Sequence, residues 1–116
     1  MRTDPMKMTL LFDEYGALLT EKQRDCFDLY FNQDLSLGEI ADELGISRQG
    51  VHDTLSRAEA ALSEWEAALG NVARNKALRR AAQELRSCIE ALSQSGDPAM
   101  QAVTARIQSA LKTLEE

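Results

Sequence analysis

The stretch that decides the fold is SLGEIADELGISRQGVHDTL, residues 36–55. Ser36 and Glu39 form the S-x-x-E pattern of a capping box, which begins a helix. Gly45 stands where a left-handed residue closes a helix, and Ser47 is a second N-cap. Two helices joined by a tight turn at a glycine are typical of a helix-turn-helix. An ordinary helical hairpin that turns at a glycine is the alternative interpretation.

The apolar residues of this stretch fall where a helix-turn-helix needs them. Ala41 must be small, because the second helix crosses close to the first at this point. The shared core of the two helices would take the other apolar side chains, which are Ile40, Leu44, Ile46, Val51 and Leu55. The pattern therefore predicts two helices that pack on each other.

Caps and hydrophobic periodicity place six helices along the chain, so the predicted fold class is all-α. The first helix covers about residues 6–15 and should stop at Gly16. The second begins at a T-x-x-Q capping box, Thr20 to Gln23, and fades near residues 32–34. The third and fourth are the two helices of the quoted stretch.

The fourth helix is longer than a DNA-reading helix needs. Apolar residues step by three and four from Val51 to Leu69, the spacing of a heptad seam, and Gly70 ends it. At about 1.5 Å per residue, the helix from residue 48 to residue 69 would reach roughly 33 Å, so its second half should serve packing. Trp65 lies on this seam and is expected to contact the C-terminal helices or a second copy of the chain.

Two further helices begin at Asn71 and at Pro98, with a turn at Ser95–Asp97 between them. Both carry apolar residues three and four apart, which predicts an antiparallel helical hairpin. The expected organisation is a helix-turn-helix domain over residues 1–70 and a C-terminal hairpin over residues 71–116. We expect the hairpin to pack on the long fourth helix.

Composition and charge limit the functions that the chain can have. The 116 residues are 44% hydrophobic and carry a net charge of −6, as expected for a folded domain. The charge is uneven, because residues 1–70 carry a net −8 and residues 71–116 a net +2. Affinity for nucleic acid grows with the number of cations brought to the phosphates, so the first half is handicapped as an autonomous DNA binder.

The sequence offers no signal for membrane insertion or catalysis. No apolar run approaches the ~20 residues of a membrane span and no targeting segment is visible, so a cytoplasmic protein is expected. Cys26 and Cys88 have no metal-ligand partners nearby in sequence and are expected to be buried, reduced thiols. His52 is the only histidine. We therefore expect no enzyme, no metal site and no cofactor.

The first half of the chain resembles known proteins. Residues 18–51, LLTEKQRDCFDLYFNQDLSLGEIADELGISRQGV, are similar to region 4 of bacterial sigma factors. A wider resemblance is to the YlxM family of small bacterial proteins. It rests on LLFDEYGALLTEKQR (10–24), DLSLGEIADELGISRQGVHDTLSRAE (34–59) and ALSEWEAALG (61–70). The resemblance covers residues 8–70, and the remainder is similar only in being helical.

The resemblance implies both a fold and a role. The fold is a sigma region 4-like helix-turn-helix bundle. The role is a regulatory or accessory one in the signal recognition particle pathway, with the protein Ffh, the particle's RNA or both as partners. The main alternative is a sequence-specific DNA-binding transcription regulator. A third hypothesis is a module that makes only protein contacts.

If nucleic acid is bound through the helix-turn-helix, the contacts should come from the start of the fourth helix. Gln49 could pair with adenine, and Arg48 could contact guanine or a phosphate. Ser47 and the amides of the first turn could hold a phosphate, and Arg57 could add a backbone contact. His52 lies on the same exposed side of the helix. Solvated surface positions are the alternative interpretation of all five residues.

Two residues of the same helix argue against DNA reading. Asp53 would repel phosphates and most base-edge acceptors. Gly50 lowers helix propensity by about 1 kcal/mol relative to Ala, where a reading helix should be rigid. Strong autonomous DNA affinity is therefore not expected from this segment.

A second candidate surface is a basic cluster in the fifth helix. Arg79 and Arg86 are seven residues apart and share one helix face, and Lys76 and Arg80 share another. The full patch comprises Arg74, Lys76, Arg79, Arg80 and Arg86. Such a patch is suited to hold RNA phosphates or an acidic partner. The alternative is a solvated face with salt bridges to the acidic first half.

The apolar seams also leave the oligomeric state open. Seams on three helices either close on each other in a monomer or leave one stripe for a twofold partner. A homodimer is therefore one of the expected assemblies.

Overall fold

The computed structural model describes residues 4–115, and helices account for nearly all of them. The elements in chain order are α1 (Pro5–Tyr15), η1 (Gly16–Leu18), α2 (Glu21–Phe27), η2 (Asp28–Asn32), α3 (Leu37–Leu44), α4 (Arg48–Leu69), α5 (Asn71–Ser93) and α6 (Pro98–Glu115). Within residues 4–115 there is no β-strand, which confirms the prediction of an all-α fold. The chain divides into two compact units, residues 1–72 and 73–116.

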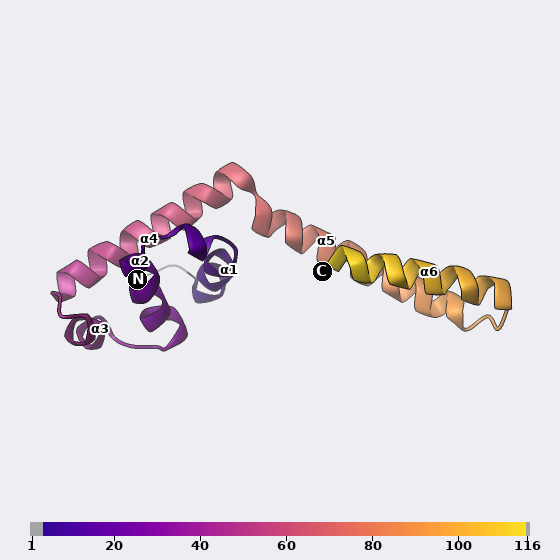
Figure 1. Ribbon diagram of the computed structural model, residues 1–116, viewed down its shortest axis with the longest axis horizontal. Coiled ribbons are helices and arrows are strands. Elements are labelled where there is room, and N and C mark those ends of the chain that lie inside the picture. The colour runs from indigo at the N-terminus through magenta and orange to yellow at the C-terminus, as the bar shows by residue number, and fades with distance from the viewer. Residues whose placement is uncertain (1–3, 116) are drawn as a thin grey trace. The chain divides into compact units, whose positions relative to one another are not determined.

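The first unit is built around the long helix α4, against which α1, α2 and α3 pack (Figure 1). Its core draws at least one large apolar side chain from every one of these helices. The fully buried ones are Met8, Leu11, Cys26, Phe27, Ile40, Val51, Leu55 and Leu62. Phe27 anchors an aromatic cluster, because its ring stacks on those of Phe12 and Phe31. The helix-turn-helix is therefore held by a continuous core of its own unit.

The turn between α3 and α4 has the geometry that the sequence predicts. Gly45 adopts a left-handed backbone with φ of 68°, a conformation that costs glycine least. The amide of Ile46 donates to the carbonyl of Ala41 over 3.1 Å and so closes the end of α3. Ala41 itself is buried where α3 meets its neighbours. The helix-turn-helix scaffold is thus present, with α4 as its second helix.

The predicted capping boxes are both formed. Thr20 and Gln23 exchange hydrogen bonds of 3.0 and 3.2 Å at the start of α2. Ser36 and Glu39 do the same at 3.0 and 3.1 Å at the start of α3. Each box satisfies two amides of a first helical turn that have no partner inside the helix.

Two details of the first unit differ from the sequence-based expectations. Gly16 does not stop α1 with a left-handed residue, since its φ is −56° and the chain continues into the 3₁₀ turn η1. Glycine is needed there for space, because a Cβ would lie 3.1 Å from the ring of Phe12. The second helix also ends differently, as its last turn η2 is π-helical. The Asp28 carboxylate, which accepts from Asn32 and Gln33 at 2.8 Å, secures this turn.

The end of α4 is tied to α1 by a small polar network. The Tyr15 hydroxyl donates to the Glu66 carboxylate over 2.6 Å and accepts from the amide of Asn71 over 3.1 Å. Trp65 packs on the core of this unit, with its ring centroid 6.4 Å from that of Tyr15. A contact of Trp65 with the C-terminal helices or with a second copy stays a prediction. Leu69, the last residue of the predicted seam, is 50% exposed.

The second unit consists of α5 and α6, which lie side by side and antiparallel (Figure 1). Asp97 caps α6 by accepting from the amide of Ala99 over 3.0 Å, as the Asp-Pro sequence predicts. The apolar side chains buried between the helices are Ala82, Ile89 and Leu111. Cys88 is exposed, which corrects the expectation that both thiols are buried, whereas Cys26 lies in the core of the first unit. Burial raises the pKa of the Cys26 thiol.

Candidate nucleic-acid interface

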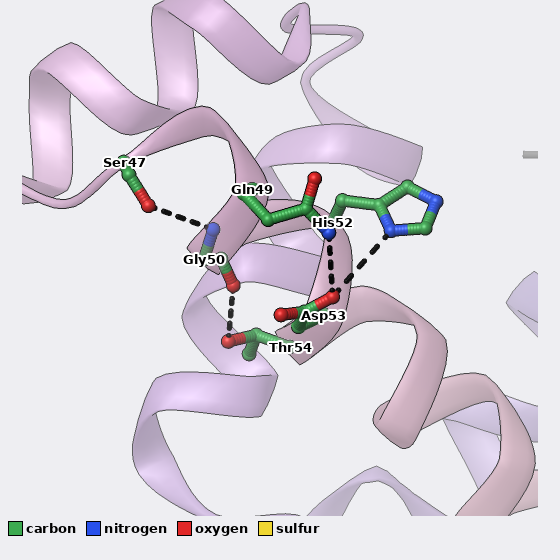
Figure 2. Close-up of polar contacts among 6 residues, drawn as sticks. All are labelled: Ser47, Gln49, Gly50, His52, Asp53 and Thr54. Carbon is green, nitrogen blue, oxygen red and sulfur yellow. Dashed lines mark hydrogen bonds and ion pairs between the residues drawn. The ribbon is translucent and has the colours of Figure 1, made fainter.

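The first turn of α4 is shaped by Ser47. Its hydroxyl accepts from the amide of Gly50 over 2.9 Å and caps the helix (Figure 2). The carbonyl of Gly50 in turn accepts from the Thr54 hydroxyl over 2.8 Å. A Cβ at residue 50 would lie 3.1 Å from the Ser47 oxygen, so glycine leaves room for the cap. Gly50 therefore has a structural use that its low helix propensity does not reveal.

Gln49, His52 and Asp53 form a cluster on the exposed side of this turn. The Gln49 amide donates to the Asp53 carboxylate over 2.9 Å, and His52 Nδ1 lies 3.8 Å from the same oxygen (Figure 2). Gln49 would have to turn its amide away from Asp53 in order to make a two-bond pair with adenine. The structure thus pairs Gln49, which was predicted to contact a base, with Asp53, whose charge was predicted to oppose DNA binding.

The two arginines of the predicted reading surface are placed differently. Arg48 is exposed at the start of α4, and its side chain passes over Gly38 of α3, where a Cβ would lie 3.8 Å from its Nε. Arg57 is exposed four residues after Asp53, on the same side of α4. Arg48 therefore lies beside the turn of the motif, whereas Arg57 lies one helical turn beyond the Gln49–Asp53 pair.

The basic patch on α5 has all five of its side chains exposed, namely those of Arg74, Lys76, Arg79, Arg80 and Arg86. Arg79 and Arg86 line the same open depression of about 450 Å³ between α5 and the end of α6. Arg86 forms an ion pair with Glu115, whose carboxylate raises the pKa of the guanidinium. One cation of the patch is thus already partnered by an acid of α6.

Sequence reasoning missed two pairings at these surfaces, that of Gln49 with Asp53 and that of Arg86 with Glu115. Asp53 was recognised as a repulsive charge, but its bond to Gln49 was not predicted, although glutamine and aspartate four residues apart commonly pair on a helix. The bond between Arg86 and Glu115 joins two helices. Its partners could be found only after the register of the hairpin was known.

Comparison with known proteins identifies the family of this chain. A family described as "putative helix-turn-helix protein, YlxM / p13 like", named UPF0122, matches residues 3–115. The chain belongs to the UPF0122 family. A UPF0122 protein of Caldanaerobacter subterraneus subsp. tengcongensis is 48% identical over 89 residues, which are 77% of this chain and 76% of the relative. One from Thermoanaerobacter sp. strain X514 is 50% identical over 90 residues, covering 78% and 77%.

A third UPF0122 protein, from Shouchella clausii, is 48% identical over 84 residues, which are 72% of this chain and 77% of the relative. The family match spans both units of the chain, whereas the resemblance seen in the sequence was confined to residues 8–70. Among residues 4–115, no helix is long and apolar enough to cross a membrane. In the same part of the chain, no group of three or more potential metal ligands comes together.

Proposed function

We propose that this UPF0122 protein is a non-catalytic accessory factor of the signal recognition particle in the cytoplasm. Its partner would be the particle's RNA, with the protein Ffh as a further contact. The observation that carries the RNA part of the proposal is the exposed basic patch on α5, which projects several cations from one helix. Cations of this kind bind the phosphate backbone without reading bases. The pathway itself is inferred from the resemblance to YlxM proteins.

Sequence-specific DNA binding is the second candidate, supported by the helix-turn-helix scaffold and its family. The Gln49–Asp53 hydrogen bond and the net −8 of residues 1–70 weigh against it. A DNA reader would also need Arg48 at a base edge. We therefore rank backbone binding through α5 above base reading through α4.

Salt-dependent binding of two variants separates these candidates. Replacing Arg79 and Arg80 by Ala should weaken binding to the particle's RNA. It should also reduce the slope of log affinity against log salt concentration by the amount expected for about two lost phosphate contacts. Lys22→Ala with Arg24→Ala removes the same charge from the first unit and is the matched control. Equal effects of the two pairs would contradict a role for the patch.

The DNA candidate predicts a different result. Arg48→Ala and Gln49→Ala should then relax sequence preference at particular base pairs, by about 1–3 kcal/mol for each good contact. The identity of the partner is tested by a tagged pull-down from native cytosol, with bound protein and RNA both identified. Recovery of neither Ffh nor its RNA would contradict the assignment to the pathway.

A further inference from the structure

The hairpin of α5 and α6 buries little of its apolar surface. Its internal core consists of three apolar side chains and Thr104, which is small for two helices of this length. Six large apolar side chains of the hairpin are 36–57% exposed, which are Leu78, Leu85, Leu92, Val103, Ile107 and Leu114. Contiguous apolar surface of this kind marks an interaction site.

The two sides of α5 differ in chemistry. Ala82 faces α6 and is completely buried. Three residues later stands Leu85, and four residues later stands Arg86. On a helix these two positions lie on opposite sides of the buried residue. From residue 78 to residue 92, one side of α5 is therefore apolar, whereas Arg74 lies on the same side one turn earlier.

Helix α6 repeats this arrangement. Leu111 faces α5 and is buried, with Leu114 three residues later and Glu115 four residues later. The ion pair between Arg86 and Glu115 shows that the charged sides of the two helices coincide. The apolar sides of the two helices then coincide as well, on the other side of the buried residues. At one end of the hairpin the two sides meet, because Leu78 and Leu114 also line the depression that Arg79 and Arg86 line.

On this side each helix carries an uninterrupted stripe with spacing 3, 4, 3, 4. The stripe on α5 is Leu78, Ala81, Leu85, Cys88 and Leu92. The stripe on α6 is Met100, Val103, Ile107, Ala110 and Leu114. Nine of these ten side chains are exposed and Met100 is half-buried. Stripes of this spacing are what helices use to pack into a bundle.

We propose that these two stripes, called here the apolar face, bind the apolar face of a second copy of the chain and form a four-helix bundle. The size of the face fits this partner. At about 1.5 Å per residue each stripe is roughly 21 Å long, and two helices packed about 10 Å apart make a face about 20 Å across. Leu78 and Leu114 line one depression, so the first residue of the α5 stripe lies near the last residue of the α6 stripe, and two faces of equal length can cover each other.

Charges at the edge of the face fix how the two copies align. Glu84 lies at the outer edge of the α5 stripe, three residues after Ala81, and Arg106 lies at the same place on α6, three residues after Val103. Both are exposed. A twofold axis parallel to the helices sets α5 against α6 of the other copy and brings Glu84 beside the opposite Arg106. The perpendicular axis would instead bring like charges together, which is unfavourable.

Sedimentation without nucleic acid tests the interface independently of the proposed function. The wild type should be a dimer at micromolar concentration, and Leu85→Glu should raise the dissociation constant at least a hundredfold. Ser87→Glu is the matched control, because it adds the same charge to the outward side of α5 and should leave the dimer intact. Far-UV circular dichroism checks that both variants keep their helices. A monomeric wild type, or a dimeric Leu85→Glu variant, would overturn the proposal.

A charge exchange tests the alignment. Glu84→Arg and Arg106→Glu should each weaken the dimer roughly tenfold, because each change occurs twice per dimer. The double variant should restore wild-type affinity. A double variant as weak as either single one would overturn the pairing of α5 with α6.

Cys88 offers a test on the unaltered protein. It lies within the apolar face, whereas Cys26 is buried in the first unit. The rate at which a maleimide modifies Cys88 should fall as the protein concentration rises through the dissociation constant. A fast rate at every concentration would contradict the dimer. Protection that is independent of concentration would show that another part of the same chain covers the face.

Discussion

Gln49 and Asp53 satisfy each other on the exposed surface of α4, and any nucleic acid that approaches must compete with this bond. The bond spans 2.9 Å. It holds the side-chain amide of Gln49 against Asp53, whose carboxylate is exposed on the same side of α4. If α4 contacts nucleic acid, this one acid would therefore act on binding in two ways, through its charge and through its hold on Gln49.

Asp53→Ala should strengthen binding to nucleic acid if α4 contacts it. We expect a gain of roughly threefold to tenfold, because unit charges about 4 Å apart interact by about 1 kcal/mol in water. Fluorescence anisotropy with labelled duplex and RNA measures the change. Asp13→Ala removes the same charge from α1 and serves as the control. Equal gains in both variants would show that only net charge matters.

Tyr15 links α1 to the start of α5 through one oxygen atom, so Tyr15→Phe should lower Tm by a few degrees. The variant leaves the Asn71 amide without the Tyr15 oxygen and removes the 2.6 Å bond to Glu66. Burial and the Glu66 carboxylate raise the pKa of Tyr15 above 10.0. The wild type should therefore lose stability as pH rises above that value, and the variant should lose less. Thermal melts at pH 7 and above pH 10 test both points.

The sequence identified the exposed polar residues of the candidate site but not their pairing. Ser47 could be named as a cap because its role depends only on the residues that follow it. The pairing of Arg86 with Glu115 depends on which turns of α5 and α6 lie opposite each other. No spacing within either helix reveals that register.

At the scale of helices, the helix ends that depend on capping residues were predicted correctly. The bounds of α4 and the left-handed glycines at residues 45 and 70 follow from capping rules. The end of α1 at Tyr15 was predicted correctly, but the left-handed conformation expected at Gly16 was not found. A glycine fits there because a Cβ would lie 3.1 Å from the ring of Phe12, which is a packing constraint. The π turn η2 was missed because it depends on the contacts of Asp28 with Asn32 and Gln33.

The capping box of α3 should make the first unit sensitive to acid. The Ser36 amide and hydroxyl lower the pKa of Glu39 below its ordinary 4.5. A lowered pKa means that the ionised form stabilises the fold above pH 4.5, and that this contribution is lost as pH falls through the folded value. Glu39→Gln should therefore show a smaller drop in Tm between pH 7 and acid than the wild type.

Glu43→Gln provides the comparison for that measurement. It removes the same charge from the other end of α3 and should keep the acid sensitivity of the wild type. If Glu43→Gln and Glu39→Gln respond to acid alike, the capping box is not the source of the effect.

At the scale of the whole molecule, the two units differ in how much apolar surface they bury. The first unit has a core with side chains from four helices, whereas the core of the second consists of three buried apolar side chains from two helices. The spacing of apolar residues in the sequence predicted that α5 and α6 each carry an apolar stripe. The spacing could not tell which of these residues face each other, because both helices carry more apolar positions than one hairpin can bury. The docking of the hairpin on α4 stays a prediction.

Hydrogen exchange should detect the difference in buried apolar surface between the two units. In dilute protein, amides of α5 and α6 should exchange faster than those of α4, since local opening is easier where few apolar contacts are lost. If the proposed dimer forms, raising the concentration should slow exchange in α5 and α6 alone, because a second copy would then cover the apolar face. Mass spectrometry of peptides from each helix, at two concentrations, measures this. Uniform slowing over all helices would contradict the assignment of the interface to the second unit.

The position of Arg86 directly after Leu85 has a consequence for recognition. In the proposed dimer Leu85 would face the second copy, so Arg86 and the cations near it would stay on the outside of the bundle. The dimer would then present two identical cationic surfaces pointing away from each other. Once one surface holds an RNA, the other meets a distant segment of the same molecule at a high effective concentration. Bivalence of this kind would favour long or folded RNAs over short ones, although neither surface reads a single base.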